Sequence, residues 1–172
     1  ALETSAIRRN AGYILNGNKL FISNGNEAEI ILLFATIDKS LRHRGITAFI
    51  VEKGTPGFSV GKLEHKLGIR ATSTAELIFQ DCFVPTANRL GGEGEGFRIA
   101  LEAIDSSRIS VAAQAVGIAQ GAFDKSLAYA KEHQQFGQSS INFQAIQWML
   151  ADMATQIDAA RQAADDQVAA SG

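Results

Sequence analysis

The stretch that decides the fold runs from Gly91 to Gly137 and reads GGEGEGFRIALEAIDSSRISVAAQAVGIAQGAFDKSLAYAKEHQQFG. Apolar residues recur in it at spacings of four and three, which predicts one stripe of a long helix. Such a helix would extend for roughly 60 Å at 1.5 Å per residue, so it needs other helices to lie against. Gly137 is a natural left-handed stop just past its end. The stripe consists of Phe97, Leu101, Ile104, Val111, Ala115, Ile118 and Ala122, with Arg108 at a position where an apolar residue would fit.

A second helix is predicted from about residue 142, with Asn142 as its cap. Its apolar stripe consists of Phe143, Ile146, Leu150, Met153 and Ile157, and continues through Ala160, Ala164 and Val168. Because the loop between the helices is short, they should pack antiparallel as a hairpin. Two helices make a poor bundle, so we expect further helices or other chains to complete it, as a dimer or tetramer.

Upstream of the glycine-rich stretch, residues 1 to about 85 are typical of β-structure without helix. Short strand-like runs alternate with turn residues, and Asn16-Gly17 predicts a two-residue hairpin. The predicted strands are 4–9, 12–15, 18–23, 30–37, 45–52, 58–63 and 75–84. The expected fold is therefore α+β, with a small antiparallel β-barrel domain (1–90) followed by part of a helical domain (91–172).

Composition narrows the function classes. The net charge of −2 gives no reason to expect a nucleic-acid or membrane partner. The single cysteine, Cys82, excludes an internal disulfide and is most simply a structural thiol. His43, His65 and His133 lack metal-ligand spacing, so no metal site is predicted. The chain also begins inside a strand-like pattern, from which we expect a longer parent protein.

Two groups of residues have a pattern that suits chemistry. Alternation along 18–23 predicts Phe21 and Ser23 on one face, where an aromatic and a hydroxyl could support a flat heterocycle, with Leu20 and Ile22 on the other. The alternative is a half-solvated strand face. Asp105 and Arg108 lie on one side of the long helix, either as a local ion pair or, if the guanidinium is buried, as a binding group for an anion or carbonyl. The glycines at 91–96 more simply form a domain joint than a phosphate loop.

Five segments together resemble the acyl-CoA dehydrogenase family, closest to its short-chain, butyryl-type members. They are LNGNKLFISNG (15–25), KLGIRATSTAELIFQDCFVP (66–85), GEGEGFRIALEAIDSSR (92–108), AAQAVGIAQ (112–120) and QFGQSSINFQAIQWMLADM (135–153). The resemblance covers nearly the whole chain. It implies the family's middle β-domain and the first two helices of its C-terminal bundle, an FAD cofactor and an acyl-CoA substrate.

The resemblance also implies roles for individual residues. Phe21 stands beside the flavin ring, Ser23 near flavin N5, and Gln144 where a neighbouring subunit contacts FAD. His133 is a departure, because the family usually has an arginine there to hold the FAD pyrophosphate, and a histidine cannot make the same two-pronged bond. The implied cofactor contacts are Phe21, Ile22, Ser23, His133, Phe136 and Gln144, and the implied substrate contacts are Asp105, Ser106, Ser107 and Arg108.

The implied reaction is α,β-dehydrogenation of an acyl-CoA thioester, with electron-transfer flavoprotein as the acceptor and a bacterial cytoplasmic or mitochondrial matrix location. In some branches of the family a glutamate base precedes the helix arginine. Ser107 occupies that position here, so we expect the base beyond Gly172 and the 172 residues alone to be inactive. Two alternatives remain: a flavin monooxygenase or acyl-CoA oxidase of the same fold, and a non-catalytic truncated or oligomerisation module.

Overall fold

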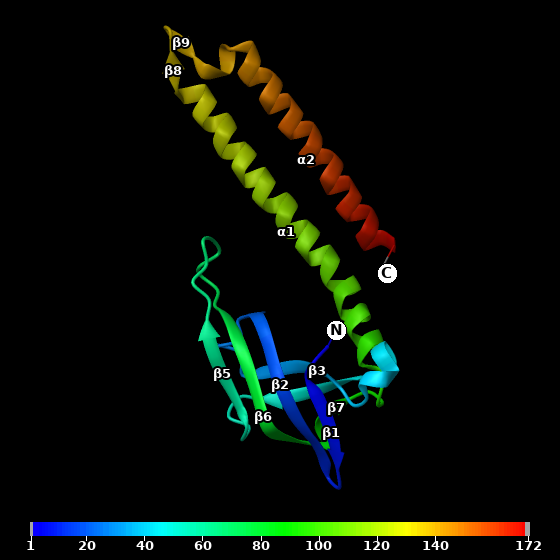
Figure 1. Cartoon of the computed structure of the whole chain (residues 1–172). Coiled ribbons are helices and arrows are strands. Elements are labelled where there is room, and N and C mark those ends of the chain that lie inside the picture. The colour runs from blue at the N-terminus through cyan, green and yellow to red at the C-terminus, as the bar shows by residue number, and fades with distance from the viewer. Residues whose placement is uncertain (1, 171–172) are drawn as a thin grey trace. The chain divides into compact units, whose positions relative to one another are not determined.

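The computed structural model describes residues 2–170, and the chain divides into two compact units between Leu101 and Glu102. The predicted α+β class is confirmed, because strands make up most of the first unit and two long helices follow (Figure 1). The strands are β1 Ser5–Arg9, β2 Gly12–Ser23, β3 Ile30–Thr36, β4 Ile46–Glu52, β5 Phe58–Leu63, β6 Thr74–Pro85, β7 Arg89–Leu90, β8 Gln134–Gln135 and β9 Gln138–Ser139. The helices are α1 Gly96–Glu132 and α2 Gln144–Ala170, with 3₁₀ segments η1 Lys39–Gly45, η2 Thr86–Asn88 and η3 Ser140–Asn142.

The first seven strands form one sheet in the order β5-β6-β2-β1-β3-β4-β7. Neighbouring strands are antiparallel except β1 and β3, which meet in parallel at Ser5 and Thr36. Side chains of β2 and β6 share one apolar core with side chains of β3 and β4, so the sheet curves around that core as a barrel does. Two aromatic pairs reinforce it, Tyr13 edge-on to Phe49 and Phe58 stacked on Phe79.

Two details of the predicted β-region are wrong. Asn16-Gly17 does not turn the chain, because β2 continues through both residues and the pairing with β6 shifts register there. Gly17 has φ +132° and a Cβ on it would lie 2.8 Å from Thr4 Cα, so glycine is needed for close approach rather than for a hairpin. Residues 39–45 form the 3₁₀ segment η1, which the strand pattern did not predict.

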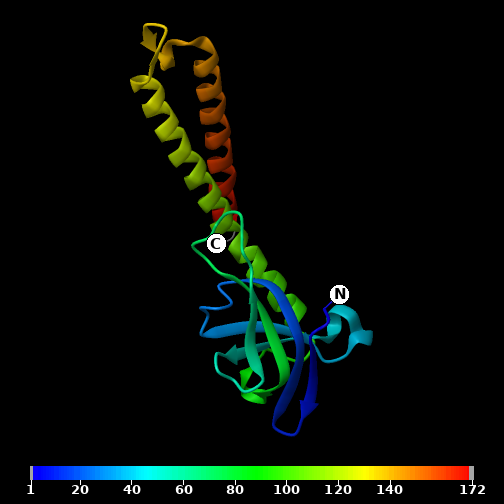
Figure 2. The same ribbon diagram turned by 60° about the vertical axis from the view of Figure 1, so that its left-hand side comes forward.

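The two helices agree with the prediction, since α1 runs through Arg108 without a break. In unit 2 the second half of α1 and α2 lie side by side and antiparallel in both views (Figures 1 and 2), and Arg161 Nη2 donates to Gln120 Oε1 at 2.7 Å between them. The space between them is lined by alanines, among them Ala115, Ala119 and Ala160, together with larger side chains. Gly137 has the expected positive φ of +78°, but it lies in the β8–β9 turn and not directly after the helix.

Much of the predicted apolar stripe on the helices is exposed. Ile104, Val111 and Ile118 on α1 and Met153 on α2 have accessible side chains. Trp148 and Met149, outside the predicted stripe of α2, are accessible as well. Apolar surface of this kind is typical of a face that another element covers.

The hydroxyl of Tyr13 holds the segment that leads into α1. It donates to Glu93 Oε1 and accepts from Arg89 Nη1, while Glu93 also forms ion pairs with Arg8 and Arg89 at 3.4 and 3.6 Å. Tyr13 itself is only 1% exposed. A buried hydroxyl with two charged partners ties β2 to the glycine-rich joint after β7.

We predict that Tyr13→Phe lowers the free energy of unfolding by about 1–2 kcal/mol, because the partly buried side chains of Glu93 and Arg89 lose a partner while the ring keeps its packing. Urea unfolding monitored by circular dichroism measures the change. Tyr129→Phe is the matched control, since that hydroxyl is bonded to no other described residue and its ring stacks on His133. Equal effects of the two substitutions would contradict the role given to the Tyr13 hydroxyl.

Candidate functional site

The C-terminal part of β2 contains a β-bulge at the predicted flavin-facing residues. Lys19 pairs with Leu77 and Ile22 pairs with Ala75, so Leu20 and Phe21 together face the single residue Glu76. The strict alternation predicted for 18–23 is therefore wrong at this point. Ile22 packs against the core while Leu20 is exposed, because the extra residue changes the order in which side chains point.

Phe21 itself has an unfavourable conformation and environment. Its φ is +57°, in the left-handed region that non-glycine residues avoid, and its side chain is 69% exposed. The nearby Ser23 hydroxyl makes no hydrogen bond to the rest of the described chain. Strained residues of this kind cluster at binding sites, where surrounding structure compensates for their cost. The geometry therefore offers an accessible aromatic ring with an unused hydroxyl two residues away.

Lys19, at the start of the bulge, was not predicted as a site residue from the sequence. Its partner across the sheet, Leu77, is buried in the core, so Lys19 lies in a row of core-facing residues. Burial lowers the pKa of Lys19 to about 8. The one signal in the sequence was a lysine at a position of β2 where the two-residue period would place an apolar side chain.

The substrate segment predicted at 105–108 lies on α1 and is open to solvent. Arg108 Nε lies 3.7 Å from Asp105 Oδ1, as the ion-pair interpretation predicted. The Arg108 side chain is 72% exposed among the described residues, so the argument from a buried charge does not apply. Ser107 and Arg108 line a hollow of about 740 Å³ between α1 and α2, but the Ser107 hydroxyl is bonded to the Ile104 carbonyl at 2.9 Å.

The remaining predicted cofactor contacts lie around the connection between α1 and α2. His133 Nδ1 is hydrogen-bonded to Ser140 Oγ at 2.9 Å, and its ring stacks on Tyr129. Phe136 is 92% exposed with φ +52°, and its ring meets Phe143 edge-on. Gln144 is the exposed first residue of α2. The structure thus brings His133, Phe136 and Gln144 to one end of the helical hairpin.

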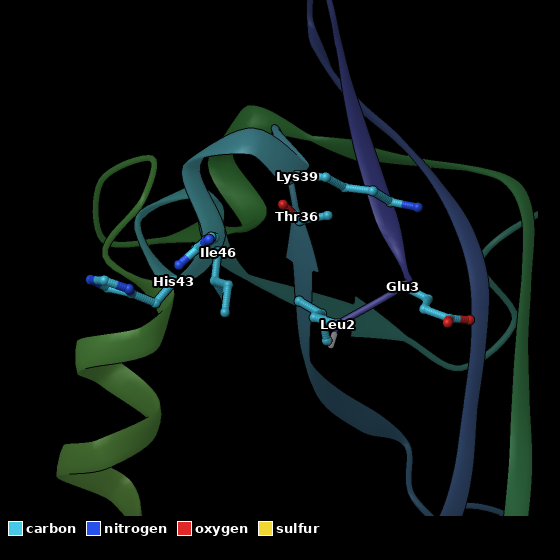
Figure 3. A pocket seen from close by; sticks show the side chains of 7 residues that line it. Leu2, Glu3, Thr36, Lys39, His43 and Ile46 are labelled. Carbon is cyan, nitrogen blue, oxygen red and sulfur yellow. The ribbon is translucent and has the colours of Figure 1, made fainter.

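A basic pocket between the N-terminal segment and η1 was not predicted (Figure 3). Its volume is about 570 Å³, and its lining includes Lys39, Arg42 and His43, with Glu3 as the single acid. Thr36 lines the same pocket and is 5% exposed, yet its hydroxyl has no hydrogen-bond partner. Such an orphaned buried hydroxyl requires a partner, and the surrounding charge favours an anion.

The local fold explains why these cations gather. Asp38 accepts from the backbone N–H and hydroxyl of Ser40 at 2.8 and 2.7 Å and begins η1, which lowers the pKa of the Asp38 carboxyl. Arg42 has φ +54°, so the segment turns sharply and returns into β4. The sequence KSLRHRG carried the signal in its four basic residues, but only the turn places three of them in the pocket with Thr36.

Comparison with known proteins decides the family. Residues 1–82 match the family model "Acyl-CoA dehydrogenase, middle domain", and residues 94–171 match "Acyl-CoA dehydrogenase, C-terminal domain". The chain belongs to the acyl-CoA dehydrogenase family. The resemblance to that family is thereby confirmed.

Individual relatives place the chain near the short-chain members of the acyl-CoA dehydrogenase family. It is 51% identical over 161 residues to the short-chain specific acyl-CoA dehydrogenase of Clostridium acetobutylicum (94% of this chain, 42% of the relative). It is 54% identical over 163 residues to the acryloyl-CoA reductase (NADH) of Anaerotignum propionicum (94% and 41%). The solved butyryl-CoA dehydrogenase of Megasphaera elsdenii is 49% identical with a TM-score of 0.94 (96% and 43%). The chain therefore spans about two-fifths of the length of these relatives.

Two other classes of site find no support in residues 2–170. The part of the chain that the structure describes holds no group of three or more histidine, cysteine and acidic residues placed to bind a metal. None of its helices is long and apolar enough to cross a membrane.

We predict that Lys19→Met raises the melting temperature at pH 7, because it removes an ammonium that burial disfavours. The folded state binds fewer protons than the unfolded state between pH 8 and 10.5, so the Lys19 penalty is fully present below pH 8 and disappears as the pH rises through this window. The stability difference between variant and wild type should therefore shrink from pH 7 to pH 10. Lys125→Met, on the exposed surface of α1, is the control.

Comparing the stability of the variant with that of wild type at each pH also cancels the contributions of other titrating groups. Burial raises the pKa of the Cys82 thiol, which lowers stability at high pH in both proteins equally. A difference that stays constant or grows with pH would contradict the burial of Lys19.

Proposed function

We propose that the chain supplies flavin and acyl-CoA contacts for the α,β-dehydrogenation of short-chain acyl-CoA thioesters. The observation that carries the proposal is the bulge at Leu20–Phe21, which presents a strained, accessible aromatic ring beside the free hydroxyl of Ser23. That combination fits a flat heterocycle that needs a stacking surface and one hydrogen-bond donor. FAD, the group implied by the family resemblance, supplies a hydride acceptor when bound.

Within this proposal the bulge positions the ring. Ile22, directly after Phe21, packs against the core, and Asn24 N–H donates to the Ser73 carbonyl at 3.0 Å, so two contacts fix the backbone that follows Phe21. Phe21 would cover one face of the heterocycle and exclude water from it. Ser23 would donate its hydroxyl to a ring acceptor, and this contact would fix the orientation of the ring.

The second proposed flavin contact, at His133, Phe136 and Gln144, requires a neighbouring chain. Arg108 lies on α1, and His133 directly follows the last residue of that helix, 25 positions later, which corresponds to roughly 38 Å at 1.5 Å per residue. One chain therefore cannot offer both groups to the same reacting centre. We propose a dimer or tetramer in which these residues reach the flavin of a neighbour, as the uncovered apolar faces of α1 and α2 also suggest.

At His133 the proposed hold on FAD is weaker than an arginine would give. Its Nδ1 is already bonded to Ser140, so a single ring nitrogen remains for a phosphate oxygen. This arrangement supports the expectation of loose flavin binding.

For the substrate, we propose that the pocket at Thr36 takes phosphate groups of the acyl-CoA. Asp105–Arg108 are proposed separately as contacts of the same substrate, as the family resemblance implies. Lys39 and Arg42 offer positive charge and Thr36 a buried hydroxyl, while Glu3 offsets part of that charge. Asp105 is engaged by Arg108, so we keep the proposal that a carboxylate outside these residues removes the α-proton. Electron-transfer flavoprotein is the proposed acceptor.

Substitution of Phe21 by Asn should separate binding from stability. Asparagine tolerates the left-handed conformation, so we expect unchanged or slightly higher stability, by up to about 1 kcal/mol. Loss of the ring should weaken FAD binding about tenfold or more. Titration of FAD followed by flavin fluorescence, together with urea unfolding, measures both effects.

Leu20→Asn is the matched control for Phe21. Leu20 is its exposed apolar neighbour and has no proposed flavin contact, so this variant should bind FAD like wild type. The proposal fails if Phe21→Asn lowers stability and leaves FAD binding unaffected.

The phosphate pocket is tested by Lys39→Gln. Removal of one cation should raise the Kd for coenzyme A about threefold to tenfold at low salt, and added salt should reduce the difference. Isothermal titration of coenzyme A and of pantetheine, which lacks the nucleotide, measures it. Lys53→Gln, a lysine paired with Glu29 elsewhere on the same unit, should have no effect. A loss that is equal for pantetheine would show that Lys39 does not act on phosphate.

Catalysis by the 172 residues alone is tested by anaerobic mixing of the FAD-supplemented chain with butyryl-CoA. We expect no bleaching of the flavin absorbance, because the proposed base is not among these residues. Bleaching at about 1 per second or faster would place the base inside the chain.

A second candidate reaction is reduction of an enoyl-CoA, favoured by the 54% identity to an acryloyl-CoA reductase. Assays on a longer protein that contains this segment would distinguish dehydrogenation from enoyl-CoA reduction. Bleaching by butyryl-CoA supports dehydrogenation, whereas NADH consumption with acryloyl-CoA supports the reductase.

A further inference from the structure

Lys19 is the one lysine of seven whose ammonium group is removed from water without a compensating partner. Among the described residues its side chain makes no hydrogen bond or ion pair. Three other lysines have partners: Lys53 with Glu29 and the Asn26 carbonyl, Lys62 with Glu64, and Lys66 with Thr72. Lys39, Lys125 and Lys131 are exposed.

The surroundings of Lys19 are apolar on the face that it occupies. Leu77 lies directly across on β6, and Val60 of β5 pairs with Leu77 from the other side. The nearest acid on β6, Glu76, is one residue from Leu77 and so points to the opposite face, where Asn18 Nδ2 donates to it at 2.8 Å. Glu64 on the connection after β5 is engaged by Lys62. Within residues 2–170, no carboxylate therefore stabilises the charged form of Lys19.

We propose that Lys19 is a site of acylation by acyl-CoA thioesters. The neutral amine attacks the thioester carbonyl carbon, a C–N bond forms and the C–S bond breaks. Coenzyme A leaves as a thiolate and takes up the proton that the nitrogen releases. The amide product carries no charge, so the apolar surroundings that disfavour the ammonium favour the product.

Reactivity follows from the fraction of neutral amine. With a pKa of about 8, half of Lys19 is neutral at pH 8. A lysine with the ordinary value of 10.5 is neutral to only about 0.3% at that pH. The lower basicity and partial burial of Lys19 offset some of this advantage, so we expect an excess of about tenfold over exposed lysines. The abundance of acyl-CoA near Lys19 rests on the proposed function, but the reactivity of the amine does not.

The test incubates the chain at pH 8 with butyryl-CoA and, separately, with the butyryl thioester of N-acetylcysteamine, which lacks the nucleotide. Peptide mass spectrometry then measures butyrylation at each lysine. Lys19 should react about tenfold faster than Lys39 and Lys125 with both reagents, and its rate should be half-maximal near pH 8. The same chain unfolded in urea should lose this selectivity, and Lys19→Arg should remove the fastest phase.

Two results would overturn the proposal: labelling of Lys19 no faster than of Lys39 and Lys125 with either thioester, or selectivity that persists in urea. The small thioester separates this inference from the proposed function, because it needs no coenzyme A site. Failure of the phosphate-pocket or flavin experiments would leave the labelling result unchanged.

Discussion

The pairing of β2 with β6 is the constraint on which the candidate site depends. These two 12-residue strands remain paired along most of their length, and their inner side chains supply Leu15, Leu77, Phe79 and Cys82 to the core. The pairing contains two irregularities, one on each strand. At the first, β6 has the extra residue and Gly17 passes against Thr4; at the second, β2 has it and Phe21 is turned outward. Without a rigid core on both sides, a strained aromatic residue would relax into an ordinary strand conformation.

Features that are unfavourable for stability gather where ligand binding is proposed. Phe21 and Phe136 combine a left-handed backbone with an exposed ring, Thr36 leaves a buried hydroxyl without a partner, and Lys19 is a cation among apolar side chains. Elsewhere the first unit follows the usual rules, with an apolar core and a tyrosine whose hydroxyl is bonded twice. This contrast agrees with the general rule that functional positions depart from what favours a stable fold, while the residues around them follow it.

The helical unit differs from the first unit because many of its apolar side chains are exposed among the described residues. Alanines line much of the space between α1 and α2, and the apolar side chains of Ile104, Val111, Ile118 and Trp148 remain accessible. The three residues proposed to touch a flavin lie around the connection between α1 and α2, far along the chain from Asp105–Arg108. Both observations are consistent with a site that needs more than one chain or more than these residues.

The sequence by itself determined the α+β class, the change from strands to helices near Gly91, the helical hairpin and the family, because hydrophobic period and motif order are local properties of the chain. It also identified Phe21, His133 and Gln144 through the resemblance. Only the tertiary structure decided that Asn16-Gly17 continues a strand, that the alternation breaks at Phe21, and that Arg108 is exposed. The basic pocket at Thr36 and the apolar surroundings of Lys19 likewise depend on residues far apart in sequence. Register, bulges and burial are set by which strand lies opposite, and no window of a single strand contains that information.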